Sequence, residues 1–126
     1  MPKIPLLSEA EWKVMKVLWS KSPQPAYDII ARLAKTEDWH PNTVKTILSR
    51  LRKKKALGVQ KYKNLFLYST RVTEQECVHA ESESFLQRLF GGSAKPLLVY
   101  CAKRQKLTAA DLDELKELLR EKGDPK

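Results

Sequence analysis

The chain has 126 residues, of which 42% are hydrophobic and 31% charged, and its formal net charge is +9. This length suits one domain, or one small domain with an accessory element, and the composition excludes a disordered chain. The longest apolar run, Pro96 to Ala102, is too short for a transmembrane helix. The opening MPKIPLLSEAEW contains no apolar signal-peptide core, which favours a cytoplasmic location.

Two helices are predicted near the start of the chain. Ser8 and Glu11 have the spacing of a capping box, in which each side chain accepts a hydrogen bond from the other residue's backbone N–H. Apolar residues then recur at helical spacing as far as about Ser20. Residues 21–25 contain two prolines and are predicted as a loop, and a shorter helix is predicted over about residues 26–34.

A third helix is predicted from Pro41 to about Lys54, because proline suits the first position of a helix. Its buried side is predicted to consist of apolar residues at helical spacing, namely Val44, Ile47, Leu48 and Leu51. No acidic residue occurs between Asp38 and Glu74. Surface helices of soluble proteins normally mix both signs of charge, so this acid-free stretch indicates a polyanionic partner.

The outward side of this helix has the residue types that a helix in the DNA major groove requires. Short or flexible donors let the backbone approach the base edges, and lysines at the helix exit suit the phosphates. The predicted DNA-binding residues are Asn42, Thr43, Lys45, Thr46, Ser49, Arg50, Lys53, Lys54, Lys55, Lys61 and Lys63.

The next segment changes from a helical to a β-favouring pattern. The runs VQKY and LFLY predict two short strands, separated by Lys63-Asn64. Asparagine tolerates the positive φ of a tight hairpin turn, so the positive φ is expected at Asn64. These strands form a two-stranded ribbon with basic residues toward its tip.

Three further helices are predicted after residue 72. The first begins with a capping box at Thr73 and ends at Gly91-Gly92, and the second lies within residues 93–103. The third begins with a capping box at Thr108 and ends at Gly123. The predicted fold is mainly α with a small β-hairpin wing. A winged helix-turn-helix DNA-binding domain over residues 1–72 is followed by a helical dimerisation domain over residues 73–126.

The three carboxy-terminal helices have more apolar surface than they can cover among themselves, and a two-fold partner would cover it. The predicted dimerisation residues are Phe85, Leu86, Leu89, Phe90, Leu97, Leu98, Leu112, Leu115, Leu118 and Leu119. The alternative is that these helices fold back onto the winged domain.

Several stretches together resemble the penicillinase repressors, the BlaI/MecI family: SEAEWKVMKVLW, PNTVKTILSRLRKKKAL, YKNLFLYS and LTAADLDELKELL. The resemblance implies a bacterial repressor that binds a palindromic double-stranded operator as a homodimer. It assigns DNA reading to Asn42, Thr43, Lys45, Thr46 and Arg50. It also implies control of β-lactam-resistance genes, relieved when a membrane-bound sensor protease cuts the carboxy-terminal region.

The family's cleavage position is usually an Asn-Phe bond, and the aligned position here is Tyr100-Cys101, so the chain departs from the family pattern at this bond. No spacing of histidine, cysteine, serine or acidic residues indicates catalysis or a metal site, and no cofactor is predicted. The remaining alternatives are a non-specific or architectural DNA-binding protein, and a repressor of this type that responds to a different signal.

Overall fold

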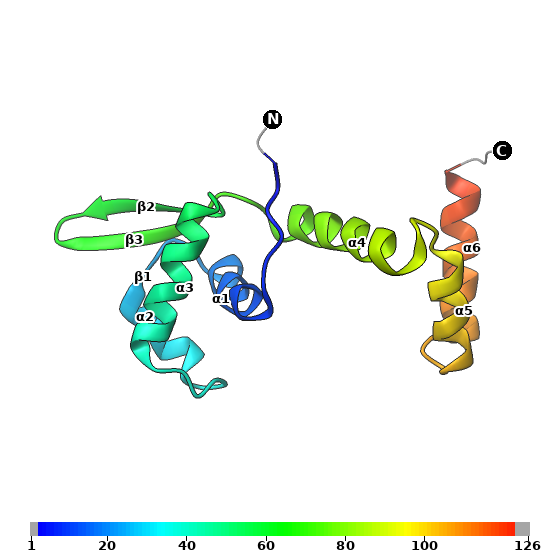
Figure 1. The fold of residues 1–126 in the computed structure, drawn as a ribbon, viewed down its shortest axis with the longest axis horizontal. Coiled ribbons are helices and arrows are strands. Elements are labelled where there is room, and N and C mark those ends of the chain that lie inside the picture. The colour runs from blue at the N-terminus through cyan, green and yellow to red at the C-terminus, as the bar shows by residue number, and fades with distance from the viewer. Residues whose placement is uncertain (1–2, 123–126) are drawn as a thin grey trace. The chain divides into compact units, whose positions relative to one another are not determined.

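The structure, a computed structural model, describes residues 3–122. Its elements, in chain order, are α1 (Glu9–Ser20), β1 (Gln24–Pro25), α2 (Ala26–Leu33), α3 (Pro41–Lys53), β2 (Leu57–Tyr62), β3 (Leu65–Thr70), α4 (Glu74–Phe90), α5 (Lys95–Lys103) and α6 (Ala109–Glu121) (Figure 1). The predicted class, mainly α with a small β wing, is confirmed. Within residues 3–122, none of these helices is long and apolar enough to cross a membrane.

The chain divides into two compact units, and the boundary lies within α4, between Ser82 and Glu83. The first turns of α4 belong to the amino-terminal unit because Cys77, only 2% exposed, is part of its hydrophobic core. This compact unit therefore continues past residue 72, the predicted end of the DNA-binding domain.

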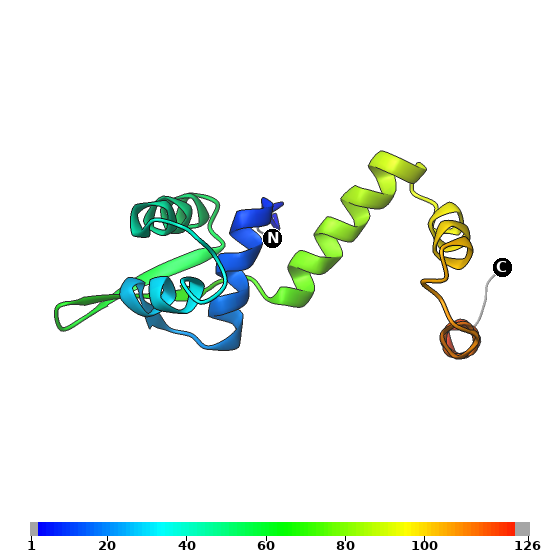
Figure 2. The same cartoon turned by 90° about the horizontal axis from the view of Figure 1, so that it is seen from below.

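Helices α1, α2 and α3 surround the core of the amino-terminal unit (Figure 2). Each helix buries one apolar stripe at helical spacing, as amphipathic helices do. The buried residues of these stripes are Val14, Met15, Leu18, Ile29, Leu33, Val44, Ile47, Leu48 and Leu51. The predicted capping box at the start of α1 is confirmed: Ser8 N donates to Glu11 Oε1 at 2.8 Å, and Glu11 N donates to Ser8 Oγ at 3.2 Å.

The sheet is antiparallel with the strand order β1-β3-β2. In the β2–β3 hairpin, Tyr62 pairs with Leu65 and Lys61 pairs with Phe66. This register leaves Lys63 and Asn64 as the turn, and the positive φ of 57° lies at Lys63. The expectation that Asn64 would take the positive φ is wrong. The pairing register fixes Lys63-Asn64 as a two-residue turn, and within it the positive φ lies at the first position rather than at the asparagine.

Residues 21–25 were predicted as a loop, but the last two of them form strand β1. It consists of two residues that pair with β3, Gln24 with Tyr68 and Pro25 with Leu67. Proline is tolerated there because β1 is an edge strand and needs no inward N–H donor. The strand exists only through this long-range pairing, so local sequence patterns do not indicate it.

The carboxy-terminal unit contains the end of α4 together with α5 and α6. Helix α4 ends at Phe90, before Gly91 and Gly92 with φ of +61° and +94°, as predicted. None of residues 83–122 is buried. Helix α6 runs to Glu121, and the predicted end at Gly123 lies outside the described residues.

Candidate nucleic-acid interface

Helix α3 separates apolar and polar residues onto two faces. Val44, Ile47, Leu48 and Leu51 are each at most 4% exposed and pack into the core. Every other described residue of α3 is exposed to solvent. The core therefore fixes the helix by one face and leaves the opposite face free for a partner.

The first turn of α3 is held by a histidine cap. His40 precedes the helix, and its Nδ1 accepts a hydrogen bond from Asn42 N at 3.0 Å. An imidazole nitrogen accepts only when it carries no proton, so this cap requires the neutral side chain. Pro41 follows at the first helical position, where its missing N–H removes no hydrogen bond.

The structure brings the predicted reading residues together on the exposed face of α3 and along its edges. These residues are Asn42, Thr43, Lys45, Thr46, Ser49 and Arg50, and all are exposed. Thr46 Oγ1 donates to Asn42 O at 3.0 Å, so its oxygen remains available as an acceptor. The face presents donors and acceptors of the types that read base edges.

The end of α3 is closed by a Schellman motif around Lys55. Ala56 N donates to Leu51 O at 2.9 Å, and Lys55 N donates to Arg52 O at 2.9 Å. This motif places Lys55 in the left-handed region at φ 67°, a position that normally favours glycine. The structure leaves both Lys53 and Lys55 exposed at the helix exit.

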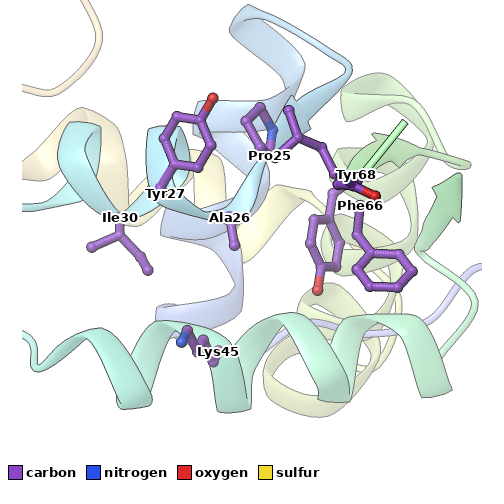
Figure 3. Close-up of a pocket in the computed structure, with 9 residues that line it drawn as sticks. Pro25, Ala26, Tyr27, Ile30, Lys45, Phe66 and Tyr68 are labelled. Carbon is purple, nitrogen blue, oxygen red and sulfur yellow. The ribbon is translucent and has the colours of Figure 1, made fainter. Parts of the chain in front are cut away.

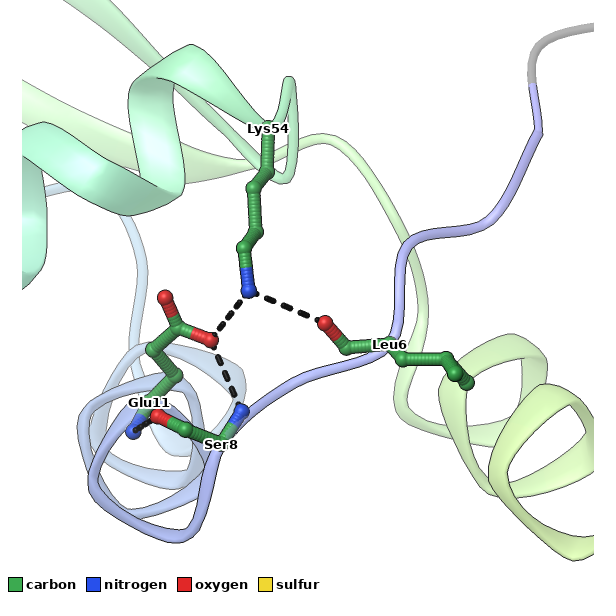
Figure 4. Close-up of polar contacts among 4 residues, drawn as sticks. All are labelled: Leu6, Ser8, Glu11 and Lys54. Atoms are coloured by element: carbon green, nitrogen blue, oxygen red, sulfur yellow. Dashed lines mark hydrogen bonds and ion pairs between the residues drawn. The ribbon is translucent and has the colours of Figure 1, made fainter. Parts of the chain in front are cut away.

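Lys54 differs from its neighbours because its ammonium group is bonded within the protein (Figure 4). Lys54 Nζ lies 2.6 Å from Glu11 Oε1 and donates to Leu6 O at 3.0 Å. Burial opposes ionisation of Glu11, but hydrogen bonds from Lys54 and Ser8 outweigh it and lower the pKa of this carboxyl group. The pair joins the end of α3 to the start of α1, so Lys54 has a structural role, and its DNA contact stays a prediction.

The wing carries its two predicted lysines over aromatic rings. Lys61 Nζ lies 6.0 Å from the centroid of the Phe66 ring, and Lys63 Nζ lies 5.5 Å from that of Tyr62. Neighbouring strand residues point to opposite faces, so Lys61 and Phe66 share one face of the hairpin and Tyr62 lies on the other. The wing thus offers cationic and apolar groups on both faces.

A cavity of about 360 Å³ lies between α2, α3 and the wing (Figure 3). Its lining includes Tyr27 of α2, Lys45 of α3, and Asn64 and Phe66 of the wing. Of these residues, only Lys45 was predicted from the sequence to contact DNA. Phe66 could have been predicted as a site residue, because it is an aromatic residue opposite a lysine in the predicted hairpin. No local sequence pattern indicated that Tyr27 lines the cavity.

The lysines and arginines of α3 and the wing have almost no acidic partners. Among the ion pairs of residues 3–122, only the one with Lys54 involves a base between Trp39 and Thr73. Uncompensated lysines and arginines on one surface produce a positive potential that attracts polyanions. The fold and this surface define a winged helix-turn-helix protein whose third helix exposes basic and polar side chains.

The two cysteines lie in different surroundings. Burial raises the pKa of the Cys77 thiol, and the carboxylates of Glu76 and Glu74 raise it further. Cys101 is half-buried on α5. No group of three or more histidine, cysteine or acidic side chains within residues 3–122 is placed to hold a metal ion.

Comparison with known proteins gives the family. The sequence profile described as "Penicillinase repressor" matches residues 7–121, so the chain belongs to the penicillinase repressor family, whose members are DNA-binding transcriptional repressors. It is 36% identical to the penicillinase repressor of Bacillus licheniformis, over 96% of this chain and 94% of that protein. It is 29% identical to the methicillin resistance regulatory protein MecI of Staphylococcus aureus, over 92% of this chain and 94% of that protein.

Two solved structures match the amino-terminal part of the chain. They are the DNA-binding domain of the repressor BlaI, and the monomeric form of Bacillus licheniformis BlaI in complex with the blaP half-operator. Each is 42% identical with a TM-score of 0.54, and the match covers 60% of this chain and 93% of the other. The winged-helix fold is therefore shared with a domain that has been solved on DNA.

Proposed function

We propose that this chain is a sequence-specific transcriptional repressor that binds a palindromic DNA operator as a homodimer. The observation that carries the proposal is the outer face of α3, which is exposed, rich in donors and free of acids. The relative solved with a half-operator supports DNA as the partner, because its domain has this fold at 42% identity.

In this proposal the residues of the interface divide into two roles. Asn42, Thr46, Ser49 and Arg50 lie on the outer face of α3 or along its edge and read base edges in the major groove. The second group contacts phosphates and sets the register without reading sequence. The ammonium groups of Lys45, Lys53, Lys55, Lys61 and Lys63 neutralise phosphate charge, and the Thr43 hydroxyl donates a hydrogen bond. The resemblance to the family additionally assigns Thr43 and Lys45 to reading.

Dimerisation is proposed for the carboxy-terminal unit. Its predicted contact residues are at best half-buried, and Leu89, Leu112 and Leu119 are 58%, 47% and 70% exposed. Isolated helices of this length are marginal in water without tertiary packing. A second copy of the unit would bury these side chains and would place two α3 helices on two half-sites.

The proposed signal is proteolysis at or near Tyr100-Cys101 by a membrane-bound sensor protease, with β-lactam-resistance genes as targets. The names of the relatives, a penicillinase repressor and a methicillin resistance regulatory protein, support the choice of target genes, and the protease is implied by the family resemblance alone. The bond lies inside α5, a nine-residue helix with no buried residue, so the helix opens locally at low free-energy cost. Mass spectrometry of the protein from β-lactam-treated cells should recover a fragment ending in this region, and an intact chain would contradict this signal.

The decisive experiment is a footprint of the purified full chain on the promoter DNA of its own gene, at about 0.15 M salt. A protected, roughly palindromic site that survives excess competitor DNA supports the specific dimeric repressor. Diffuse, salt-labile binding without a protected site contradicts it and favours the alternative of an architectural DNA-binding protein.

A further inference from the structure

We propose that the cavity between α2, α3 and the wing holds one sugar-phosphate segment of the duplex that α3 reads. Tyr27 and Phe66 pack against the deoxyribose, and Lys45 pairs with the phosphate. The inference rests on the proposed function, because it assumes that α3 faces DNA. It adds two aromatic contacts to an interface otherwise made of polar and basic groups.

The shape of the cavity suits a narrow, partly apolar ligand. Its volume of about 360 Å³ is at the lower end of the range for small-molecule sites. Figure 3 shows its walls coming from three elements, with Tyr27 on α2, Lys45 on α3, and Phe66 beside Tyr68 on the wing. The open side leaves room for a chain that enters and leaves, as a nucleic-acid backbone does.

Two large aromatic side chains at this cavity remain in water. Tyr27 is 60% exposed and Phe66 is 57% exposed, although neither is needed to complete the core. Leu65, also lining the cavity, is 40% exposed. An exposed apolar patch beside a polar group is typical of a binding surface, and the apolar face of a deoxyribose ring is a matching partner.

The positive charge at the cavity favours an anionic occupant. Lys45 is the one charged residue in the lining, and among residues 3–122 it forms no ion pair. Lys61 extends over the Phe66 ring and brings a second cation to the wing side. Asn64 adds an amide donor at the turn. One anionic group between these donors would be neutralised without competition from an acid in the lining.

The position of the cavity identifies the occupant as the duplex backbone rather than a separate ligand. Lys45 lies on α3 next to Thr46 on the reading face, so the cavity continues directly from the proposed major-groove contacts. A helix in the major groove is flanked by the phosphates of the strand at its edge. A single strand would instead stack its bases on the two rings.

The test compares full-length variants on two labelled probes, the footprinted promoter fragment and a duplex of arbitrary sequence. Tyr27→Ala and Phe66→Ala should each raise Kd about fivefold or more on both probes, because a backbone contact carries no sequence information. Val78→Ala is the control: Val78 is 47% exposed on α4, does not line the cavity and is not proposed to contact DNA, so the Kd of this variant should change less than twofold. Melting temperatures establish that all variants fold.

A second readout locates the phosphate. Single phosphates of the promoter fragment are replaced in turn by neutral methylphosphonates. At one position this replacement should weaken binding of the wild type but not of Lys45→Ala. Unchanged affinity of Tyr27→Ala and Phe66→Ala on both probes would overturn the inference, as would an equal loss in Val78→Ala. A larger loss on one strand of the promoter fragment, measured as a third probe, would also overturn it. If wild type shows no sequence preference, the proposed function fails, and the aromatic variants on the arbitrary duplex still decide the cavity.

Discussion

Replacing Lys54 by methionine should destabilise the amino-terminal unit through Glu11. The Glu11 side chain is 3% exposed and lies 2.6 Å from Lys54 Nζ, whereas the Lys54 side chain is 37% exposed. Removing the cation leaves a buried carboxylate whose remaining hydrogen-bond donor is the Ser8 backbone N–H. Breaking a fully buried pair costs about 3–5 kcal/mol, and the partial exposure of Lys54 reduces this to about 2 kcal/mol.

Replacing the other member of the pair, Glu11, should destabilise the unit less. In Glu11→Gln the lysine can reach water, so we expect a loss of about 1 kcal/mol in the free energy of unfolding. The double variant should lose less than the sum of the single losses, because no buried charge is left unpaired. A loss of about 2 kcal/mol corresponds to a melting temperature lower by roughly 8–16 °C in a domain of this size.

The effect of Lys54→Met should depend on pH in a defined direction. The pKa of Glu11 is lowered in the folded chain, so the stability from its charge is present above the ordinary carboxyl value of 4.5 and is lost as the pH falls through the folded value. The difference in the free energy of unfolding between wild type and Lys54→Met should therefore be largest near neutral pH, and it should shrink below about pH 4.5.

Urea unfolding followed by tryptophan fluorescence measures these losses. Lys53→Met is the matched control, because Lys53 is adjacent, exposed and without an ion pair among the described residues; it should leave stability unchanged while weakening DNA binding. Lys55→Gly should be neutral or stabilising by up to about 1 kcal/mol, because glycine suits the left-handed position, yet it should also weaken DNA binding. A loss below about 0.5 kcal/mol in Lys54→Met, or strictly additive losses in the double variant, would refute the reasoning.

Three further predictions concern reading, assembly and thiol chemistry. Thr46→Ala and Arg50→Ala should each raise Kd for the protected operator about tenfold, with a smaller change on arbitrary DNA, and equal changes in a competition assay would count against reading. Truncation after Ser82 should leave a folded monomer that binds the operator about a hundredfold more weakly; a dimer by light scattering, or unchanged affinity, would refute the assignment of assembly to the carboxy-terminal unit. Iodoacetamide should label Cys101 before Cys77, because Cys77 is 2% exposed and its pKa is raised; peptide mass spectrometry showing the opposite order would be inconsistent with the packing described.

The sequence was informative where a single element carries its own signal. The capping boxes at Ser8, Thr73 and Thr108 all form, because each is made by residues three apart. The buried stripe of α3 could be predicted from helical spacing alone. The acid-free stretch and the exposed position of Arg50 on α3 were likewise readable from the chain, since they depend on composition and on the geometry of one helix.

Other features depend on contacts between distant residues, and local patterns do not contain them. Lys54 looked identical to Lys53 and Lys55 in the sequence, and only the packing of α3 against α1 places its ammonium group on Glu11. The pairing of β2 with β3 decided which two residues form the turn, and the positive φ lies at Lys63 rather than at the asparagine.

By itself, the sequence determined the order and type of the helices and wing, the buried and exposed faces of α3, and the family, because periodicity, caps and charge are local properties of the chain. Tertiary structure alone decided that β1 joins the sheet, that Cys77 extends the first unit into α4, and that Tyr27 and Phe66 face a common cavity. Each of these features joins residues far apart in sequence, so the free energy that fixes them comes from packing and pairing across the fold rather than from local preference.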